Sequence, residues 1–402
     1  WESGLYITLD GQGGGVTGSV HIGENGKLKC LHRIKLPNSI GFFYAGATKA
    51  LGFKIGKHEG KVTGLAAYGK PNKECVQFFQ KIVKFDNSTL VAADVIGSYP
   101  KMIKFVRLIG KKNFAASVQY VFEEVIKEFV DYWALKTGIR RIGLAGGVFA
   151  NVKLNQKIHE LKSIQEIYIF PNMSDGGLAF GACLDQYPWS SRPIKNMYLG
   201  PEYSDEEIKN ALIKNNLNFE KPENAPKKIA LLLADSKVVA RFGGRMEYGP
   251  RALGNRSILY RPDIPEVNDW LNKSLNRTEF MPFAPVTMRE YAEECYLGLE
   301  GAERSAEYMT ITFECSEQMQ KKAPGVVHLD GTARPQLLRR EVNPFYYDII
   351  NYFYNETGIP TLVNTSFNMH EEPIVCSPED AIRSFRLGRI DFLSIGPYLV
   401  SL

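Results

Sequence analysis

The sequence lacks the features of a membrane-spanning protein, of a disulfide-rich protein and of a metalloprotein with histidine ligands. Its apolar runs are short; IALLLA, residues 229–234, is typical of the longest and fits a buried helix, so we expect no membrane partner. The six cysteines form no C-x-x-C pair and show no metal-site spacing, which favours reduced thiols in a cytoplasmic protein. The histidines form no H-x-x-x-H or H-E-x-x-H pair, and neither a G-x-S-x-G nor a P-loop lysine motif occurs. A self-sufficient histidine metal site is thereby excluded.

An excess of charge is also missing, because 49 basic side chains stand against 44 acidic ones, for a net charge of +5. This balance does not favour a general nucleic-acid binder, so we expect no nucleic-acid partner, although a local basic pocket stays compatible with it. The hydrophobic content of 44% is ordinary for a globular protein, and 402 residues favour two domains. The chain begins in a predicted strand without a methionine or signal peptide, which we interpret as a fragment, with processing as the alternative.

Residues 1–190 have the pattern of an α/β domain. A strand rich in β-branched residues at 4–10, a glycine-rich turn and a return strand predict a β-hairpin. Apolar residues at helical spacing predict a helix over 114–136, with Gly138 at its end. Two further strands, the second at residues 166–170, each lead into a glycine loop. Strands that feed glycine loops and then helices indicate an α/β fold with ligands at the strand ends.

The composition changes after residue 190. Pro, Ser and Tyr are frequent over residues 191–228, which we interpret as a connector containing a short acidic helix. A second α/β domain is predicted over residues 229–402, where a buried strand at 238–242 leads directly into RMEYGPRALGNRSILYR. Its glycines and proline would break a helix, so we expect a stiff loop that presents arginines.

Two aspartates of the first domain occupy similar positions. Asp10, in TLDGQGGG, and Asp175, in NMSDGGLAFGA, each follow a strand and precede glycines that let a phosphate or metal approach the backbone. Such carboxylates suit a divalent cation that bridges to phosphate oxygens, although each alone is equally typical of a cap or turn. Gly146 and Gly147 would let a ribose or base lie against the chain, with Asn151 as a hydrogen-bonding amide. The alternative for these residues is close helix–strand packing.

Polar side chains of the second domain gather in four loops. Arginines on stiff Gly/Pro backbone favour bidentate capture of a phosphate or carboxylate, with neutral donors nearby for a small planar group. The candidates are Arg245, Arg251, Arg256, Lys273, Arg277, Thr332, Arg334, Asn364 and Ser366. Ordinary ion pairing is the alternative, and it fits Arg245 and Arg261 as well as ligand binding does. Arg251 and Arg256 have no adjacent acid, which favours a ligand role for them.

Eight motifs together resemble the O-carbamoyltransferase family of nodulation proteins and antibiotic-tailoring enzymes. They stand in the family's order and are DGQGGG, HEGKVTGLAAYGKP, GGVFAN, DGGLAFGA, EYGPRALGNRSIL, MPFAPV, DGTARPQ, and NTSFN followed by EPIV. They extend over nearly the whole chain. The set is specific, whereas a single motif would not be.

This resemblance implies an actin/Hsp70-like duplicated α/β domain, related to the tRNA threonylcarbamoyl transferase, followed by a threonylcarbamoyl-AMP synthase-like α/β domain. The second domain would form carbamoyl-adenylate from carbamoyl phosphate and ATP. The first would transfer the carbamoyl group to a hydroxyl of a sugar or natural product. The implied cofactors are ATP with Mg²⁺ and a divalent metal, Fe²⁺ by family resemblance. A homodimer is compatible with the sequence.

The resemblance also implies roles for the candidate residues. Asp10 would be catalytic and would share a metal with Asp175, beside a nucleotide lined by Gly146, Gly147 and Asn151. Carbamoyl phosphate and ATP would be held by Arg251, Arg256, Arg277, Arg334 and Asn364, with Thr332 and Ser366 close by. Lys273 would compensate for Met281, which stands where the family often has a second phosphate arginine.

Two departures from the family bear on these expectations. The family's histidine pair that completes the metal site lies upstream of the Asp10 motif, a segment missing here, so we expect the metal to be weakly held. Glu371 stands where glycine is frequent. Two other functions stay compatible: threonylcarbamoyl transfer to tRNA, and a nucleotide-binding regulator without transferase activity. The sequence predicts neither the acceptor nor the group that deprotonates it.

Overall fold

A computed structural model describes residues 1–186, 194–264 and 283–401. The chain divides into two compact units. Unit 1 comprises Trp1–Arg192 together with Glu300–Ser305 and Thr310–Thr312, and unit 2 comprises the rest. Lys273 and Arg277 lie outside the described residues.

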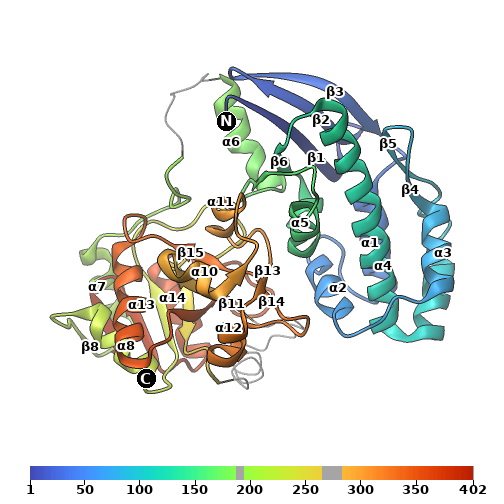
Figure 1. Cartoon of the computed structure of the whole chain (residues 1–402). Coiled ribbons are helices and arrows are strands. Elements are labelled where there is room, and N and C mark those ends of the chain that lie inside the picture. Colours follow the sequence, from blue (N-terminus) through green and yellow to red (C-terminus); the bar gives the residue numbers. More distant parts are fainter. Residues whose placement is uncertain (187–193, 265–282, 402) are drawn as a thin grey trace. The chain divides into compact units, whose positions relative to one another are not determined.

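Unit 1 is built on a five-stranded sheet with the order β3-β2-β1-β6-β7 (Figure 1). Its strands are β1 (Ser3–Gly13), β2 (Val16–Glu24), β3 (Lys27–Lys35), β6 (Arg141–Ala145) and β7 (Glu166–Ile169). The first three strands form an antiparallel meander, which confirms the predicted hairpin, whereas β1, β6 and β7 run parallel. The carboxyl ends of these three parallel strands therefore lie at one edge of the sheet, where the loops after β1, β6 and β7 meet.

Helices cover this sheet, and Figure 1 shows α1 and α4 side by side. The helices of unit 1 are α1 (Ile40–Ala50), α2 (Glu59–Ala66), α3 (Lys73–Ile82), α4 (Tyr99–Thr137), α5 (Val152–His159) and α6 (Leu178–Gln186). Gly110 has non-helical torsions, φ 78° and ψ 160°, and divides α4 into two segments. The second segment contains the predicted helix 114–136, and it ends at Gly138 with φ 69°, as predicted. A two-stranded sheet, β4 (Val83–Asp86) with β5 (Thr89–Ala92), completes this region.

Unit 2 contains a mixed eight-stranded sheet with the order β15-β11-β16-β10-β9-β17-β18-β8. Its strands are β8 (Phe219–Glu220), β9 (Val239–Phe242), β10 (Arg256–Tyr260), β11 (Ala284–Met288), β15 (Gln336–Leu338), β16 (Thr361–Ser366), β17 (Phe392–Ile395) and β18 (Tyr398–Ser401). The predicted strand at 238–242 is β9, and the arginine-rich loop connects it to β10. Its main helices are α7 (Asp205–Lys214), α8 (Ala225–Ala234), α13 (Pro344–Thr357) and α14 (Pro378–Leu387).

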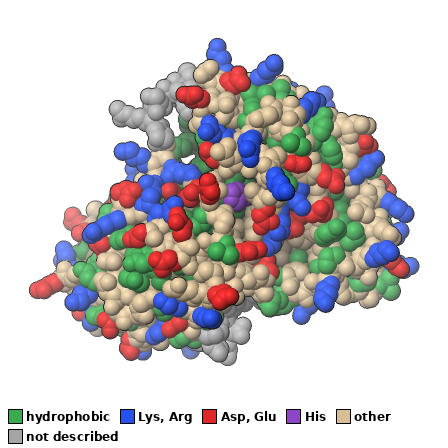
Figure 2. Space-filling model, in the orientation of Figure 1, with side chains coloured by type: hydrophobic (Ala, Val, Ile, Leu, Met, Phe, Trp, Pro, Cys, Tyr) green, Lys and Arg blue, Asp and Glu red, His purple; other side chains and the backbone are tan. Residues whose placement is uncertain are grey.

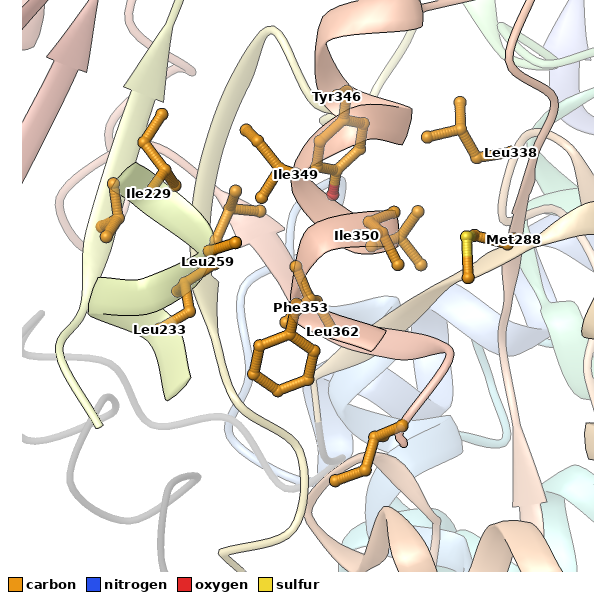
Figure 3. Packing of buried hydrophobic residues seen from close by; sticks show 14 residues of the cluster. Ile229, Leu233, Leu259, Met288, Leu338, Tyr346, Ile349, Ile350, Phe353 and Leu362 are labelled. Carbon is orange, nitrogen blue, oxygen red and sulfur yellow. The ribbon is translucent and has the colours of Figure 1, made fainter. Parts of the chain in front are cut away.

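The core of unit 2 lies between this sheet and helices α8 and α13 (Figure 3). Leu233 of α8 and Phe353 of α13 are fully buried with Leu259 and Leu362 of the sheet. Burying each such side chain stabilises the fold by about 1.5–3 kcal/mol. The run IALLLA thus belongs to a helix with a buried face, as the sequence predicts, and the packed core fixes β9 and β10 at the two ends of the arginine-rich loop.

Two features of the chain's division do not follow from local sequence. Helix α7 and strand β8 lie within residues 191–228, and β8 pairs with β18 as an edge strand of unit 2. Residues 300–305 and 310–312 belong to unit 1, where the Ser305 hydroxyl donates to Ile167 O and the Asn155 amide donates to Thr310 O. Such long-range backbone contacts have no signature in composition.

The predicted α/β class is confirmed for both units. Within the described residues unit 1 holds one five-stranded sheet, whereas a duplicated domain would have two. None of the helices in the described ranges combines the length and the apolar character needed to cross a bilayer.

Candidate functional site

Asp10 lies where β1 leaves the strand register shared with β2, at the carboxyl edge of the sheet. Its carboxylate is oriented by two backbone N–H groups: Gly11 N donates to Oδ1 at 2.6 Å and Gly147 N donates to Oδ2 at 2.8 Å. The side chain is half-buried. A carboxylate offers about four acceptor sites, so two donors fix its orientation and leave acceptor capacity for a ligand.

Gly146 and Gly147 allow the loop after β6 to reach Asp10. Gly146 has φ 102°, and a Cβ there would lie 2.1 Å from the Leu9 carbonyl oxygen, so no side chain fits. A Cβ on Gly147 would lie 3.2 Å from Asp10 Oδ1. Gly146 N also donates to Met173 O at 2.6 Å, which brings the loop after β7 to the same place. The three predicted loops therefore converge.

The amino terminus of α1 packs against the Asp10 loop, a contact that the motifs do not reveal. Ser39 caps α1 by accepting from Phe42 N at 3.1 Å, and its hydroxyl donates to Gly11 O at 2.6 Å. A Cβ on Gly41 would lie 2.6 Å from Gly11 N. The free N–H groups of a helix amino terminus favour anions, so this packing adds positive potential beside the Asp10 loop. The signal available in the sequence was a serine directly before an apolar helix.

Asp175 begins the loop helix that follows β7, and its side chain is exposed. Strand β6 separates β1 from β7, so the strands that lead to Asp10 and Asp175 lie roughly 10 Å apart across the sheet. The loop that contains Met173 folds back over part of this distance. Among the residues that the structure describes, no three His, Cys, Asp or Glu side chains are grouped to hold a metal.

Asn151 is buried and its side chain already has several partners. The amide oxygen accepts from Leu154 N, as the cap of α5, and from Gln119 Nε2, both at 3.1 Å. The amide nitrogen donates to Gln119 Oε1 at 3.0 Å and Thr63 Oγ1 at 3.2 Å. A contact between Asn151 and a nucleotide stays a prediction, and it would have to replace one of these hydrogen bonds.

In unit 2, Glu247 organises the arginine-rich loop. Its side chain is 5% exposed, and Oε1 accepts from Leu253 N at 2.7 Å, Asn255 N at 2.8 Å and Arg256 N at 3.2 Å. Hydrogen bonds to an ionised acceptor are about twice as strong as neutral ones. Glu247 therefore fixes the backbone of the loop. The sequence indicates only ion pairing for acidic residues near this loop, because capture of backbone N–H groups depends on loop conformation.

Arg256 is fully buried, and Glu247 lies beside its backbone although no acid stands next to it in the sequence. Glu247 accepts from its backbone, and its guanidinium donates to Asn255 O at 2.9 Å and Gly243 O at 3.2 Å. The guanidinium also lies 3.8 Å from the centroid of the Phe242 ring. Burial lowers the pKa of Arg256, and Glu247 opposes that shift. These contacts hold the loop together, and a contact between Arg256 and a ligand stays a prediction.

The other arginines at the ends of this loop differ in their partners. Arg245 donates to Gly200 O at 3.2 Å and Leu199 O at 3.1 Å, so it binds backbone carbonyls. Arg261 forms the ion pair that the sequence offered as an alternative, with Arg261 Nη2 2.6 Å from Asp263 Oδ2. Arg251 is half-buried in the middle of the loop.

Asn364 of β16 lies next to the loop and joins it to β15. Its amide nitrogen donates to Ala252 O at 3.2 Å and Gln336 Oε1 at 2.8 Å, and Gln336 Nε2 donates to Leu253 O at 2.8 Å. The structure thus brings the arginine-rich loop and the NTSFN and DGTARPQ motifs together. Gln336 was not among the predicted residues, although it stands within DGTARPQ.

The remaining predicted residues within the described ranges belong to the DGTARPQ and NTSFN motifs. Thr332 is buried; its hydroxyl donates to Asp330 Oδ1 at 2.7 Å and lies 3.2 Å from His328 Nδ1. Ser366 donates to Asn368 Oδ1 at 2.6 Å. Arg334 lies between strands β14 (Thr332–Ala333) and β15, two residues before Gln336.

Several buried polar atoms around the loop have no hydrogen-bond partner within the described residues. They include Glu247 Oε2, Asn364 Oδ1, the Tyr346 hydroxyl and the Nε atoms of Arg241 and Arg256. Gly254, with φ 114°, leaves room for the Tyr346 ring, because a Cβ there would lie 2.1 Å from it. Burial lowers the pKa of Arg241 to about 10, and its guanidinium lies 4.1 Å from the centroid of the Phe345 ring. Buried donors and acceptors without partners are costly, so this region is suited to bind water or a small polar ligand.

Comparison with known families gives two matches. The family described as Carbamoyltransferase N-terminus matches residues 2–184, and the family described as Carbamoyltransferase C-terminus matches residues 230–401. Together they contain all of the candidate residues.

Several curated proteins are similar over the whole chain. An uncharacterized protein of Methanocaldococcus jannaschii is 35% identical, with 100% of this chain and 80% of that protein aligned. Nodulation protein NolNO of Sinorhizobium fredii is 33% identical, with 61% of its length covered, and Nodulation protein NolO of Bradyrhizobium diazoefficiens is 32% identical, with 76% covered. The chain therefore spans between 61% and 80% of the length of these three relatives.

A solved structure of full-length HypF, in a phosphate- and nucleotide-bound form, is 18% identical with a TM-score of 0.31. The alignment covers 42% of this chain and 21% of HypF. A TM-score this low shows neither a shared fold nor a shared ligand.

Proposed function

The chain belongs to the carbamoyltransferase family, and we propose that it activates a carbamoyl group as carbamoyl-adenylate and transfers it to a hydroxyl of a small molecule. Carbamoyl phosphate and ATP would be the substrates of activation. A sugar or natural product would be the acceptor. In this proposal the transfer domain is 1–190, 191–228 is the connector and 229–402 is the activation domain.

The observation that carries the proposal is the loop held by Glu247 in unit 2. One buried carboxylate fixes three backbone N–H groups, so Arg251 is presented from backbone with a defined conformation. Asn364 and Gln336 bind the same loop and place two further motifs beside it. Cations on a stiff loop beside amide groups suit phosphate and carbamoyl groups, whose oxygens accept and whose NH₂ donates.

Within this site we propose that Arg251 and Arg334 bind phosphate oxygens and that Asn364 and Thr332 contact the carbamoyl group. Ser366, together with Lys273 and Arg277 outside the described residues, would complete it. Arg256 has a different task in this arrangement, because its guanidinium already binds Gly243 O and Asn255 O. We assign it to positioning the loop.

The proposed activation step explains why the reaction would need both carbamoyl phosphate and ATP. A neutral hydroxyl attacks carbamoyl phosphate slowly at neutral pH. Hydrolysis of carbamoyl phosphate would give carbamate and phosphate, and attack of the carbamate oxygen on the α-phosphorus of ATP would release pyrophosphate and form carbamoyl-adenylate. The acceptor oxygen can then displace AMP at the carbamoyl carbon of this intermediate. The developing negative charge on the carbamoyl oxygen is then offset by fixed donors, and water must be kept from the intermediate.

In unit 1 we propose that the adenylate lies over Gly146 and Gly147, where no side chain obstructs the backbone. Asp10, oriented by Gly11 N and Gly147 N, would face it. A divalent metal, Fe²⁺ by family resemblance, would take ligands from Asp10 and Asp175 and supply charge stabilisation, with Mg²⁺ accompanying ATP. Two carboxylates fit such an ion only in part, since three or four protein ligands are usual.

The same proposal includes the fold relationships. The sheet order β3-β2-β1-β6-β7, with a meander followed by parallel strands, supports an actin/Hsp70-like half for unit 1. The duplication and the threonylcarbamoyl-AMP synthase-like character of unit 2 are expectations from the family resemblance.

The direct test measures AMP released from ATP with and without carbamoyl phosphate, followed by mass spectrometry of candidate hydroxyl acceptors. We expect AMP release that requires carbamoyl phosphate, and a mass gain of one carbamoyl group on a true acceptor. AMP release that is indifferent to carbamoyl phosphate would overturn the activation step, and binding of nucleotide without any AMP release would favour a regulator.

A further inference from the structure

The net charge of +5 conceals a strong separation of charge along the chain. Residues 49–112 contain 13 basic and 4 acidic side chains, a net charge of +9, whereas the other 338 residues contain 36 basic and 40 acidic ones. All but one of these 13 basic side chains are exposed, the exception being Lys61. The excess positive charge of the protein therefore belongs to one part of unit 1.

These side chains gather around the first segment of α4 and form what we call the basic surface: Lys49, Lys101, Lys104, Arg107, Lys111 and Lys112. None of the six forms an ion pair with a described residue. Their positive charge is thus uncompensated by acidic neighbours. Over the face seen in Figure 2, basic and acidic side chains are interspersed.

Aromatic rings from other elements anchor four of these lysines. Lys49 Nζ lies 5.1 Å from the Tyr99 ring centroid, and Lys101 Nζ lies 4.6 Å from that of Phe78. Lys111 and Lys112 lie 5.9 Å and 5.4 Å from the rings of Phe53 and Tyr68. These contacts bring the end of α1, helix α3 and the loops around residues 53 and 68 to one place. They also hold the ammonium groups in position, which reduces the entropy lost on binding.

Exposed aliphatic side chains lie among the charges. Lys101, Lys104 and Leu108 recur at helical spacing on the outer face of α4, and Leu108 is 67% exposed. Ile55, next to Lys54, is 50% exposed, and Ile96, just before α4, is 91% exposed. Because these side chains stay exposed, they contribute little to the free energy of folding. Each would stabilise attachment of the protein to an apolar phase in which it became buried.

We propose that the basic surface binds the anionic surface of a lipid bilayer, so that the protein works at a membrane without spanning it. Lysines near anionic headgroups and aliphatic side chains that enter the headgroup boundary are the two contributions that hold peripheral proteins. The absence of a long apolar run argues only against spanning, so it does not bear on this mode of attachment.

A single-stranded nucleic acid is the competing polyanion, and the side chains favour it less. Base stacking needs open aromatic faces, whereas the rings of Phe78, Tyr99, Phe53 and Tyr68 each have an ammonium group within about 6 Å. Exposed Leu108 and Ile96 would add nothing to a phosphate contact.

The experiment is co-sedimentation of the purified protein with vesicles of phosphatidylcholine alone or of phosphatidylcholine mixed with phosphatidylglycerol. We expect binding to the anionic vesicles that weakens as salt is added. Each basic residue near such a surface strengthens binding by about fivefold, so the triple variant Lys101→Glu, Lys104→Glu, Arg107→Glu should weaken it by at least about a hundredfold. Leu108→Ser should weaken it by about tenfold.

The matched control reverses three lysines of edge strand β3 in the same unit, Lys27→Glu, Lys29→Glu, Lys35→Glu, and should keep most of the binding. Equal binding to both kinds of vesicle, or equal losses in the two triple variants, would overturn the proposal. A third result would also overturn it, namely that the protein binds polyuridylic acid as well as vesicles and that Leu108→Ser weakens neither interaction. That result would identify a nucleic-acid surface. AMP release should be the same in every variant, which separates this proposal from the proposed function and confirms folding.

Discussion

Asp10 in unit 1 and Glu247 in unit 2 are both carboxylates that capture backbone N–H groups of glycine-rich loops, yet they are exposed to different degrees. Asp10 is half-buried and accepts from two N–H groups, so part of its acceptor capacity faces the sheet edge. Glu247 is 5% exposed and accepts from three. The same interaction therefore occurs at a half-exposed carboxylate in Asp10, whereas Glu247 shapes a buried loop and has only Oε2 without a partner among the described residues.

This comparison separates residues that we propose to touch substrate from residues that position others. In unit 2 the buried pair of Glu247 and Arg256 holds the loop from within, and Arg251 is the half-buried residue that the loop presents. In unit 1 the short loops are held by backbone contacts at Gly146, so the carboxylate of Asp10 itself can serve the ligand.

The largest effect is expected for Glu247→Ala. Three backbone N–H groups would lose their acceptor, and each buried unsatisfied group costs about 1–3 kcal/mol, so the free energy of unfolding should fall by about 3 kcal/mol or more. Glu247→Gln keeps an acceptor oxygen and should lose no more than about 1 kcal/mol. Chemical denaturation of both variants measures this, and similar losses in the two would show that the charge rather than the loop contacts matters.

The next effect distinguishes Arg256 from Arg251. Arg256→Ala removes a buried guanidinium from its backbone carbonyl acceptors and the Phe242 ring, and should lower the free energy of unfolding by about 2–3 kcal/mol. Arg251→Ala should change stability by less than about 1 kcal/mol, while slowing carbamoyl-phosphate-dependent AMP release by about 30- to 800-fold, the loss expected for a charged phosphate contact. Thermal or chemical unfolding together with AMP assays separates the two; full AMP release by Arg251→Ala would remove it from the site.

The glycine pair tests the same distinction in unit 1. Gly146→Ala would place a Cβ 2.1 Å from Leu9 O on a backbone with φ 102°, and should destabilise the protein by about 2 kcal/mol. Gly147→Ala meets only Asp10 Oδ1 at 3.2 Å and is the matched control, with an expected loss below about 1 kcal/mol. Equal unfolding free energies for the two variants would contradict the convergence of the three loops at Gly146.

The sequence predicted the helices and strands that depend on periodicity and missed the side-chain roles that depend on loop contacts. The hairpin, the helix over 114–136 and its end at Gly138 follow from side-chain patterning, which the backbone must satisfy locally. The role of Glu247 and the burial of Arg256 depend on how the stretch between these two residues folds back on itself, which no spacing encodes. The net charge of the whole chain also did not reveal the basic surface, because the acidic residues elsewhere in the chain offset the basic segment.

Glu123 provides the smallest effect and a further contrast with Glu247, because a single donor, Gln119 Nε2 at 2.6 Å, contacts its carboxylate. Burial raises the pKa of Glu123 above its ordinary value of 4.5. A raised pKa means that the protonated side chain favours the fold, and this contribution is lost as pH rises through the folded-state pKa. Glu123→Gln, which resembles the protonated form, should therefore be slightly more stable near neutral pH and equal to the unmodified protein at acidic pH. Denaturation at several pH values checks this, and an advantage that grows on acidification would contradict it.

The central claim is that unit 2 activates the carbamoyl group and unit 1 transfers it. The most direct test measures carbamoyl-phosphate-dependent release of pyrophosphate from ATP, which reports activation, and carbamoylation of an accepted hydroxyl compound in parallel for Arg251→Ala and Asp10→Asn. We expect Arg251→Ala to lose both activities, whereas Asp10→Asn keeps pyrophosphate release and loses carbamoylation. Loss of pyrophosphate release in Asp10→Asn with its fold intact, or carbamoylation that persists in Arg251→Ala, would contradict the division of labour between the two units.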